Sequence, residues 1–139
     1  MDLLIVPGTL ESLGSIGRYV LAAADAAGLD RRAAYRLRLA VDEIATNTIT
    51  HGYQEAGRTG SLAIRADLDD GTLTITMEDS APPFDPRRVE RPDQIDLPLE
   101  ERPVGGLGVY LMAQSVDEFR YEYVDGGNRN TFVVKRAGK

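Results

Sequence analysis

The feature that most constrains this chain is a change of hydrophobic period between residues 53 and 61. Before it, apolar and small residues recur every three or four positions from Asp30 to about Tyr53, as in an amphipathic helix that buries one face. After it, residues 61–79 alternate apolar and polar side chains around Asp70-Gly71, which predicts an antiparallel hairpin. This order argues against a doubly wound parallel sheet, in which strands and helices alternate.

Four further segments carry recognisable patterns. In chain order they predict a short edge strand, a first helix, a third helix and a closing hairpin, over residues 3–6, 9–28, about 106–116 and 119–134. Thr9 is expected to cap the first helix, and Asp125-Gly126-Gly127-Asn128 to form the turn of the hairpin. We therefore expect a single α+β domain over residues 1–139. It would be a two-layer sandwich, with a mixed, mostly antiparallel sheet of about five strands covered on one face by three helices.

Composition narrows the function classes. Sixteen basic and 22 acidic residues give a net charge of −6, which disfavours nucleic acid and anionic membranes as partners. The chain has no cysteine and only one histidine, His51, so it can form no disulfide, thiol nucleophile, zinc–thiolate site or multi-histidine metal site. The first ten residues lack the pattern of a signal peptide, and no later segment approaches a membrane span. We expect a soluble, cytoplasmic protein.

Polar residues interrupt the apolar pattern of the second helix. Glu43, Asn47 and His51 follow one another at four-residue intervals, which places them on one side of an α-helix, whereas Asp42 is rotated by about 100°. A carboxylate can act as a base, and an amide oxygen one turn away can ligate a hard cation such as Mg²⁺. Taken alone, an E-x-x-x-N pair is more often a solvated helix face.

Two other motifs are each weak alone. Asp79 ends the second strand of the predicted hairpin, where it could accept a hydrogen bond from an exocyclic amine or simply start a turn. The GGLG sequence of residues 105–108 places free backbone N–H groups at a helix start, where an anion such as a triphosphate is favoured, but it also suits a tight turn. Because the only lysines are Lys135 and Lys139, no P-loop lysine is available to hold a phosphate.

Together these motifs resemble a known family. Helix residues VDEIATNTITHGY, the segment DSAPPFDP, the glycine segment PLEERPVGGLGVYLM and the closing YVDGGNRNTFVV resemble the GHKL (Bergerat) ATP-binding fold. More narrowly they are similar to the stand-alone RsbW/SpoIIAB-type anti-sigma-factor serine/threonine kinases. The resemblance covers nearly the whole chain.

The resemblance implies a role for each motif. Glu43 would be the catalytic carboxylate, Asn47 the Mg²⁺ ligand and Asp79 the acceptor for the adenine amino group. The nucleotide would also contact the segment Gly105, Gly106, Leu107 and Gly108, the hinge and phosphate grip of an ATP lid over about residues 82–104. Arg18 would lie in the region that the family uses to contact protein partners.

One residue departs from the family pattern. The family usually has glycine where this chain has Ala81, which we include among the nucleotide-binding residues. Its methyl group either crowds the base or is tolerated because the backbone has ordinary dihedral angles. We expect weak ATP binding that Ala81→Gly tightens several-fold, whereas an unchanged affinity would mean that the alanine is incidental. His51 could relay a proton or orient the helix end against the following loop, and we favour the second role.

The leading hypothesis is an ATP- and Mg²⁺-dependent protein serine kinase. It would phosphorylate an anti-anti-sigma partner of the STAS type and sequester a sigma factor, and homodimers are usual in the resembled family. The alternative is a nucleotide-responsive binding module of the same fold with little or no kinase activity.

Overall fold

The structure, a computed structural model, describes residues 1–86 and 116–136. Its elements in chain order are β1 (Leu4–Pro7), the 3₁₀ turn η1 (Leu10–Ser12), α1 (Leu13–Ala26), α2 (Arg31–Asn47), the π-helix η2 (Thr48–Gln54), β2 (Ser61–Leu68), β3 (Thr72–Glu78), β4 (Glu118–Val124) and β5 (Gly127–Lys135). The third helix expected over residues 106–116, apart from its last residue, lies outside the described residues, as do the GGLG segment and positions 87–104 of the expected lid.

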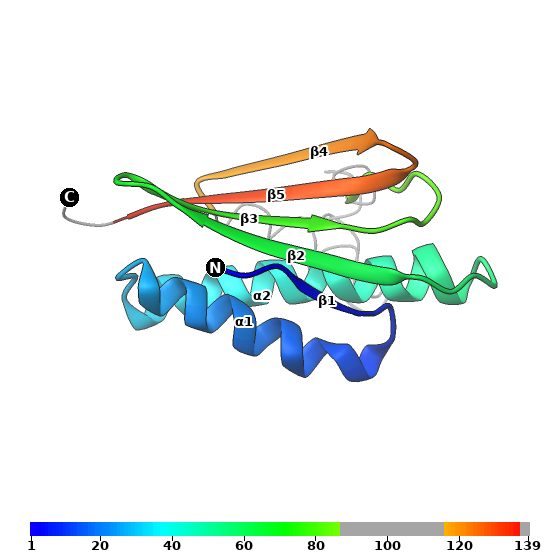
Figure 1. The fold of residues 1–139 in the computed structure, drawn as a ribbon, viewed down its shortest axis with the longest axis horizontal. Helices are drawn as coiled ribbons and strands as arrows, with labels where there is room; N and C mark the ends of the chain where they lie inside the picture. The colour runs from blue at the N-terminus through cyan, green and yellow to red at the C-terminus, as the bar shows by residue number, and fades with distance from the viewer. Residues whose placement is uncertain (87–115, 137–139) are drawn as a thin grey trace, which may run out of the picture.

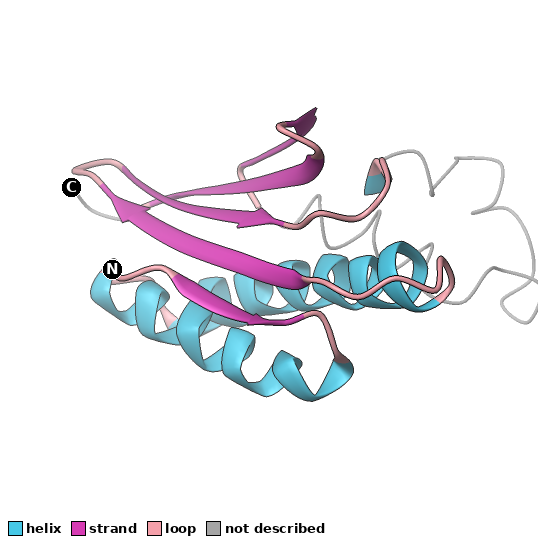
Figure 2. Ribbon diagram, turned by 45° about the vertical axis from the view of Figure 1, so that its right-hand side comes forward, coloured by secondary structure: helices cyan, strands magenta, loops and turns pink. Residues whose placement is uncertain are grey.

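The molecule has two layers. The strands form one sheet in the order β1-β2-β3-β5-β4, and α1 and α2 lie together against one face of it (Figures 1 and 2). The expected five-stranded α+β arrangement is confirmed, and β1 does lie at an edge. Every neighbouring pair of described strands is antiparallel, which agrees with the expected mostly antiparallel sheet, and no parallel pair occurs among these strands. The two hairpins and the edge strand account for three of the four pairings, and the fourth joins β3 of the first hairpin to β5 of the second.

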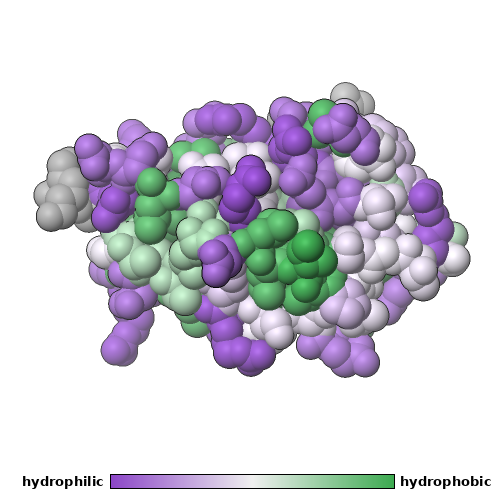
Figure 3. Space-filling view, in the orientation of Figure 1, coloured by the Kyte–Doolittle hydropathy of each residue, from purple (hydrophilic) through white to green (hydrophobic). Residues whose placement is uncertain are grey.

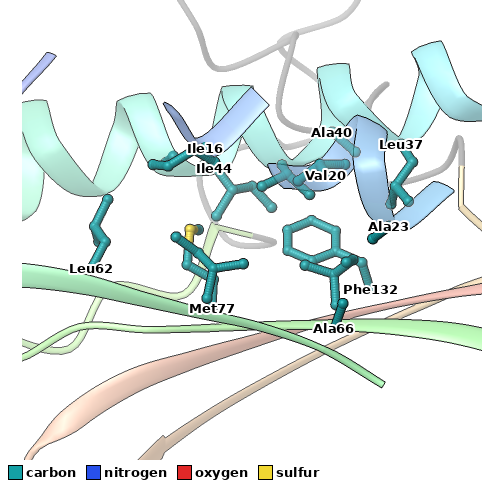
Figure 4. Packing of buried hydrophobic residues seen from close by; sticks show 14 of the residues in the cluster. Ile16, Val20, Ala23, Leu37, Ala40, Ile44, Leu62, Ala66, Met77 and Phe132 are labelled. Carbon is teal, nitrogen blue, oxygen red and sulfur yellow. The ribbon is translucent and has the colours of Figure 1, made fainter. Parts of the chain in front are cut away.

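The core lies between the helices and the inner face of the sheet. Alternate residues of the strands supply one half of it, because successive side chains of a strand point to opposite faces. Figure 4 shows how side chains of α1 and α2 meet those of the strands, with the Phe132 ring beneath the helices and Met77 opposite Ile44. The fully buried large side chains include Ile16, Val20, Leu37, Ile44, Leu62, Met77 and Phe132.

The helix starts differ in how they are capped. The Asp30 carboxylate accepts a hydrogen bond from the Ala33 N–H at 2.8 Å, which confirms it as the N-cap of α2. Thr9 precedes the 3₁₀ turn instead of α1 itself, and its hydroxyl makes no capping bond to the backbone. The chain therefore enters α1 through one tighter turn that the hydrophobic spacing did not reveal.

The second helix changes type at Asn47. It continues to Gln54, close to the expected end at Tyr53, but as a π-helix, as in the 2.9 Å bond from Glu55 N–H to the Thr50 carbonyl. In a π-helix four residues complete slightly less than a full turn, whereas in an α-helix they complete slightly more, so His51 still follows Asn47 on broadly the same side of the helix.

Both hairpin turns follow from local chemistry. In the first, the Asp69 carboxylate accepts hydrogen bonds from Gly71 N–H at 2.8 Å and Thr72 N–H at 2.7 Å. In the second, Asp125 and Gly126 have φ values of 55° and 77°, the left-handed pair of a type I′ turn. The second turn sets β5 against β4 so that Asn128 and Asn130 face the helix side of the sheet, in line with Phe132.

The opposite face of the sheet carries polar and charged side chains. Arg129 pairs there with Glu78 at 2.9 Å and with Glu122 at 3.0 Å. Apolar surface is visible where β1 runs along the edge of the molecule (Figure 3), and Ile5 in this strand is 62% exposed. Among the described residues, no helix has both the length and the apolar character needed to cross a membrane.

Candidate functional site

The end of α2 brings Glu43 and Asn47 together. The Asn47 side chain is 5% exposed, and its Nδ2 donates a hydrogen bond to the Glu43 backbone carbonyl at 2.8 Å. That bond fixes the amide, and within the described residues its Oδ1 accepts no hydrogen bond. The bond to Glu43 occupies the amide nitrogen and leaves the amide oxygen available. That oxygen is the atom of the side chain that a hard cation such as Mg²⁺ prefers.

Two carboxylates next to each other on this helix have perturbed acidity. Burial, and secondarily the neighbouring Asp42 charge, raises the pKa of Glu43. Burial also raises the pKa of Asp42, although the Arg38 guanidinium opposes that shift. A carboxylate whose pKa rises toward neutrality is a better proton acceptor than an ordinary surface glutamate. Glu43 is therefore partly buried and more basic than an ordinary surface glutamate.

Asp79 follows β3 directly and is held through one oxygen. Its Oδ1 accepts hydrogen bonds from Asn128 Nδ2 at 2.8 Å and from Ala81 N–H at 2.9 Å. Its Oδ2 is buried and has no hydrogen-bond partner. Burial raises the pKa of Asp79, and the bonds from Asn128 and Ala81 oppose that rise. An orphaned buried acceptor is costly, and it fits a ligand that brings a donor such as an exocyclic amine.

Tyr53, which the sequence did not single out, fastens the Asp79 loop to the π-helix. Its hydroxyl accepts a hydrogen bond from Ser80 N–H at 2.9 Å and donates to the Ser61 carbonyl at 2.8 Å. The ring is 1% exposed and fills the space beside Gly8 and Gly60, where an added Cβ would lie 2.6 Å from ring atoms. From the sequence alone, a tyrosine at the end of an apolar helix pattern is interpreted as a core residue. The hydrogen bond between Tyr53 and Ser80 is therefore evident only in the folded structure.

Ala81 points into the protein. It is fully buried within the hydrophobic core, and its methyl group faces Gly52 of the π-helix, where an added Cβ would lie 2.9 Å away. Its φ is not in the left-handed region, because Asp125 is the one non-glycine residue with positive φ in the described chain. Of the two readings open at position 81, this geometry favours the tolerated alanine with ordinary dihedral angles.

His51 contacts the same loop from the helix side. Its ring lies 5.9 Å from the Phe84 ring, centroid to centroid, and its Nδ1 is 2.9 Å from the Glu55 carboxylate. Arg18 is exposed on α1, and its guanidinium donates to the Ser15 hydroxyl at 3.3 Å. The candidate residues Gly105, Gly106, Leu107 and Gly108 fall outside the described residues. The π-helix and the loop after β3 are thus joined by Tyr53–Ser80, Gly52–Ala81 and His51–Phe84.

The donor set bears on which groups this site could hold. Within residues 1–86 and 116–136, no three histidine or acidic side chains cluster as a metal site would require. A lone amide oxygen at Asn47 suits Mg²⁺ only where phosphate oxygens and water complete its shell. The residues therefore fit a metal that arrives with a nucleotide, while Asp79 Oδ2 fits the amine of its base.

Known proteins resemble this chain in sequence and in fold. Residues 6–134 match the histidine kinase-like ATPase domain family. The chain is 31% identical over 93 residues to the serine-protein kinase RsbW of Bacillus thuringiensis (strain Al Hakam), a match covering 65% of this chain and 57% of that protein. It is 32% identical over 94 residues to the serine-protein kinase RsbW of Bacillus licheniformis, covering 66% and 58%. The chain thus spans less than three fifths of the length of these relatives.

A solved structure shows the same fold. The histidine kinase domain of the blue-light activated histidine kinase EL346 from Erythrobacter litoralis superposes with a TM-score of 0.57 at 21% identity. The match covers 90% of this chain and 61% of that one. The resemblance to a GHKL domain of the RsbW type is confirmed. Because the family match extends over nearly the whole sequence, the chain belongs to the histidine kinase-like ATPase domain family.

Proposed function

We propose that this chain binds Mg·ATP and transfers its γ-phosphate to a serine of a protein partner. The observation that carries the proposal is the buried carboxylate of Asp79, whose Oδ2 has no partner while its Oδ1 is fully engaged. The same loop is fastened to the helix that carries Glu43 and Asn47. Base recognition and phosphate chemistry would therefore act from one rigid frame.

Asp79 would recognise the adenine base. An ionised carboxylate only accepts hydrogen bonds, so its free oxygen selects a ligand edge that donates. The exocyclic amine of adenine donates, whereas the corresponding oxygen of guanine or hypoxanthine does not. A ligand without that donor would leave the buried oxygen unpaired, which is the condition under which hydrogen-bonding sites discriminate most strongly.

Asn47 would hold Mg²⁺ through Oδ1 while its Nδ2 stays bonded to the helix. When bound, the metal supplies neutralisation of the charge that builds up on the phosphate oxygens. The protein residues contribute position: Asn47 fixes where the cation sits, and no lysine shares that work within the described residues, where Lys135 lies at the far end of β5. A single protein ligand of this kind suits a site that holds its metal only together with the nucleotide.

Glu43 would take the proton from the attacking serine hydroxyl. Serine is a poor nucleophile until a base accepts its proton, and phosphoryl transfer otherwise depends on alignment and charge neutralisation. The raised pKa of Glu43 suits this role, and Glu43 lies one helical turn before Asn47. Asp42 is adjacent in sequence but rotated about 100° around the helix axis, so it provides a natural comparison.

The relatives support a protein serine as the phosphate acceptor. They are named serine-protein kinases, and the sequence resembles anti-sigma-factor kinases over nearly its whole length. We infer that the phosphate acceptor is an anti-anti-sigma protein of the STAS type and that the chain also sequesters a sigma factor. Exposed Arg18 on α1 is our candidate contact for these partners.

Phosphate transfer tests the proposal directly. The chain is incubated with Mg²⁺, γ-labelled ATP and each STAS-domain protein of its source organism, and labelled serine is identified by mass spectrometry. Wild type and Asp42→Asn should transfer phosphate, whereas Glu43→Gln should not, although its ATP affinity stays within a few-fold. ATP and partner binding without transfer by wild type would contradict the kinase and leave a nucleotide-responsive binding module.

A further inference from the structure

We propose that Asn128 is a positioning residue for base recognition, which fixes the Asp79 carboxylate so that Oδ2 alone faces the ligand. The inference rests on the proposed function and deepens it, because it names the residue that prepares the acceptor. Asn128 is the second residue of β5 and is 3% exposed. It lies 49 residues away from Asp79 in the sequence.

The contacts all converge on one oxygen. Asn128 Nδ2 lies 2.8 Å from Asp79 Oδ1, the Asn128 N–H lies 3.4 Å from the same atom, and Ala81 N–H lies 2.9 Å from it. The second oxygen receives no hydrogen bond. A carboxylate free to rotate would share these donors between its two oxygens. Three donors on Oδ1 instead hold the carboxylate in one orientation, so Oδ2 is prepared before any ligand arrives.

The orientation of the Asn128 amide is itself determined by its neighbours. Its Oδ1 accepts hydrogen bonds from Phe84 N–H at 2.8 Å and from the Tyr121 hydroxyl. A backbone N–H can only donate, so the amide oxygen must face Phe84 and the amide nitrogen must face Asp79. Nδ2 also donates to the Pro82 carbonyl at 3.0 Å, which leaves it no freedom to turn away.

The backbone enforces the same contact. Asp79 N–H donates to the Asn128 carbonyl at 3.1 Å, and Gly127 packs so closely that an added Cβ would overlap the Asp79 carbonyl oxygen. The start of β5 is thus in close contact with the residue after β3 at Gly127, which has no side chain. Asn128 therefore approaches Asp79 along both its backbone and its side chain.

The charges around the carboxylate predict a pH signature. Among the described residues, Tyr121 on β4 donates to the Asn128 amide, Tyr53 on η2 accepts from Ser80 N–H and Arg58 donates to the Ser80 carbonyl. The Arg129–Glu78 pair belongs to the opposite face of the sheet. Burial raises the pKa of Asp79 and the bond from Asn128 opposes that rise. In wild type, acidification should therefore weaken ATP binding, because protonation turns Oδ2 into a donor that faces the donating amine.

Replacement of Asn128 by aspartate separates positioning from packing. Asn128→Asp keeps the shape and keeps the acceptor for Phe84 N–H, but it replaces the donor that faces Asp79 with a second carboxylate oxygen. At pH 8 both carboxylates are ionised and repel, so ATP affinity should fall at least about tenfold. At pH 5.5 the pair can share one proton, which restores a donor between them. Affinity should then rise on acidification, opposite to wild type.

Calorimetric titration with Mg·ATP at pH 5.5, 6.5 and 8 measures this effect. Thr131→Ala, on the outer face of the same strand, is the matched control and should reproduce the wild-type pH dependence of ATP affinity. It also accounts for any effect of protonation of the nucleotide itself. Unfolding midpoints at each pH establish that the variants are folded. If Asn128→Asp proves unfolded at pH 8, Asn128→Ser retains a donor and should show reduced affinity with the wild-type sign of pH dependence.

Three outcomes would overturn the inference. The first is an ATP affinity of Asn128→Asp within twofold of wild type at every pH. The second is an affinity of Asn128→Asp that falls on acidification, as in wild type. The third, where Asn128→Ser is needed, is an unchanged ATP affinity of that variant. Failure of wild type itself to bind ATP would instead overturn the proposed function on which the inference rests. The reversed pH dependence of Asn128→Asp, with a normal Thr131→Ala control, is the result that we expect.

Discussion

Gly127→Ala should disrupt the candidate site through a single methyl group. A Cβ at this position would overlap the Asp79 carbonyl oxygen and lie 2.9 Å from the carbonyl carbon. Carbon atoms in contact prefer a separation of about 3.5–4.0 Å, so the two strands must part by roughly 1 Å. The backbone of Gly127 does not have a positive φ, so the steric contact alone requires glycine here.

The separation costs both packing and hydrogen bonds. Overpacking a fitted contact costs about 1–3 kcal/mol. The bonds from Asp79 N–H to the Asn128 carbonyl and from Asn128 Nδ2 to Asp79 Oδ1 would stretch beyond useful length, at about 1 kcal/mol or more each. We expect the free energy of unfolding to fall by about 3–5 kcal/mol, and the unfolding midpoint by roughly 10–15 °C for a domain of this size.

The neighbouring glycine is a matched control. Gly126 has a φ of 77° and no atom within 4 Å of an added Cβ, so Gly126→Ala introduces backbone strain without a clash. That strain should cost about 1 kcal/mol and leave ATP affinity unchanged. Chemical denaturation gives the stability of both variants and calorimetry gives their ATP affinity. Equal destabilisation by the two substitutions, or wild-type ATP affinity in Gly127→Ala, would refute the steric argument.

Three further predictions concern other parts of the site. Ala81→Gly removes a buried methyl group and raises the entropy of the unfolded chain, so the free energy of unfolding should fall by about 1–2 kcal/mol. ATP affinity should stay within twofold of wild type. A several-fold tightening, measured by calorimetry, would show that the methyl group crowds the base. Tyr53→Phe leaves the Ser80 N–H without its acceptor, so the free energy of unfolding, measured by chemical denaturation, should fall by about 1–3 kcal/mol. An unchanged stability would contradict the role of that bond. Because a base must be ionised, the phosphotransfer rate should fall on acidification through the raised pKa of Glu43. Asp42→Asn should move that fall to lower pH, and an unmoved pH–rate profile would argue against coupling of the two acids.

Local patterns were sufficient to predict most of the fold. The alternation over residues 61–79 predicted β2 and β3, the glycine turn at Asp125-Gly126 predicted the closing hairpin, and Asp30 is the cap of α2. Each of these signals depends on residues close in sequence, where side-chain period and turn chemistry determine conformation. The order of the strands was not predicted, because strand pairing depends on contacts between distant segments, which periodicity does not report.

The candidate site was predictable only in part. Motif spacing and the family resemblance predicted Glu43, Asn47 and Asp79 as site residues, but the residues that hold them could not be recognised from the sequence. Asn128 was read as a turn residue, and Tyr53 as the end of an apolar helix pattern. Their roles arise from hydrogen bonds between segments 27 to 49 residues apart, which no local pattern encodes. The π-helix after Asn47 likewise has no marker in the spacing of apolar residues.

Recognition of the adenine amine by Asp79 is the central claim, and paired calorimetric titrations with Mg·ATP and Mg·ITP test it most directly. The two nucleotides differ at the base edge, where ATP carries a donating amine and ITP an oxygen. Wild type should bind ITP at least about thirtyfold more weakly than ATP, because two acceptors would meet at Asp79 Oδ2 in a buried site. Asp79→Asn, which can place a donor there, should narrow the gap. Equal affinity of wild type for the two nucleotides would contradict the account.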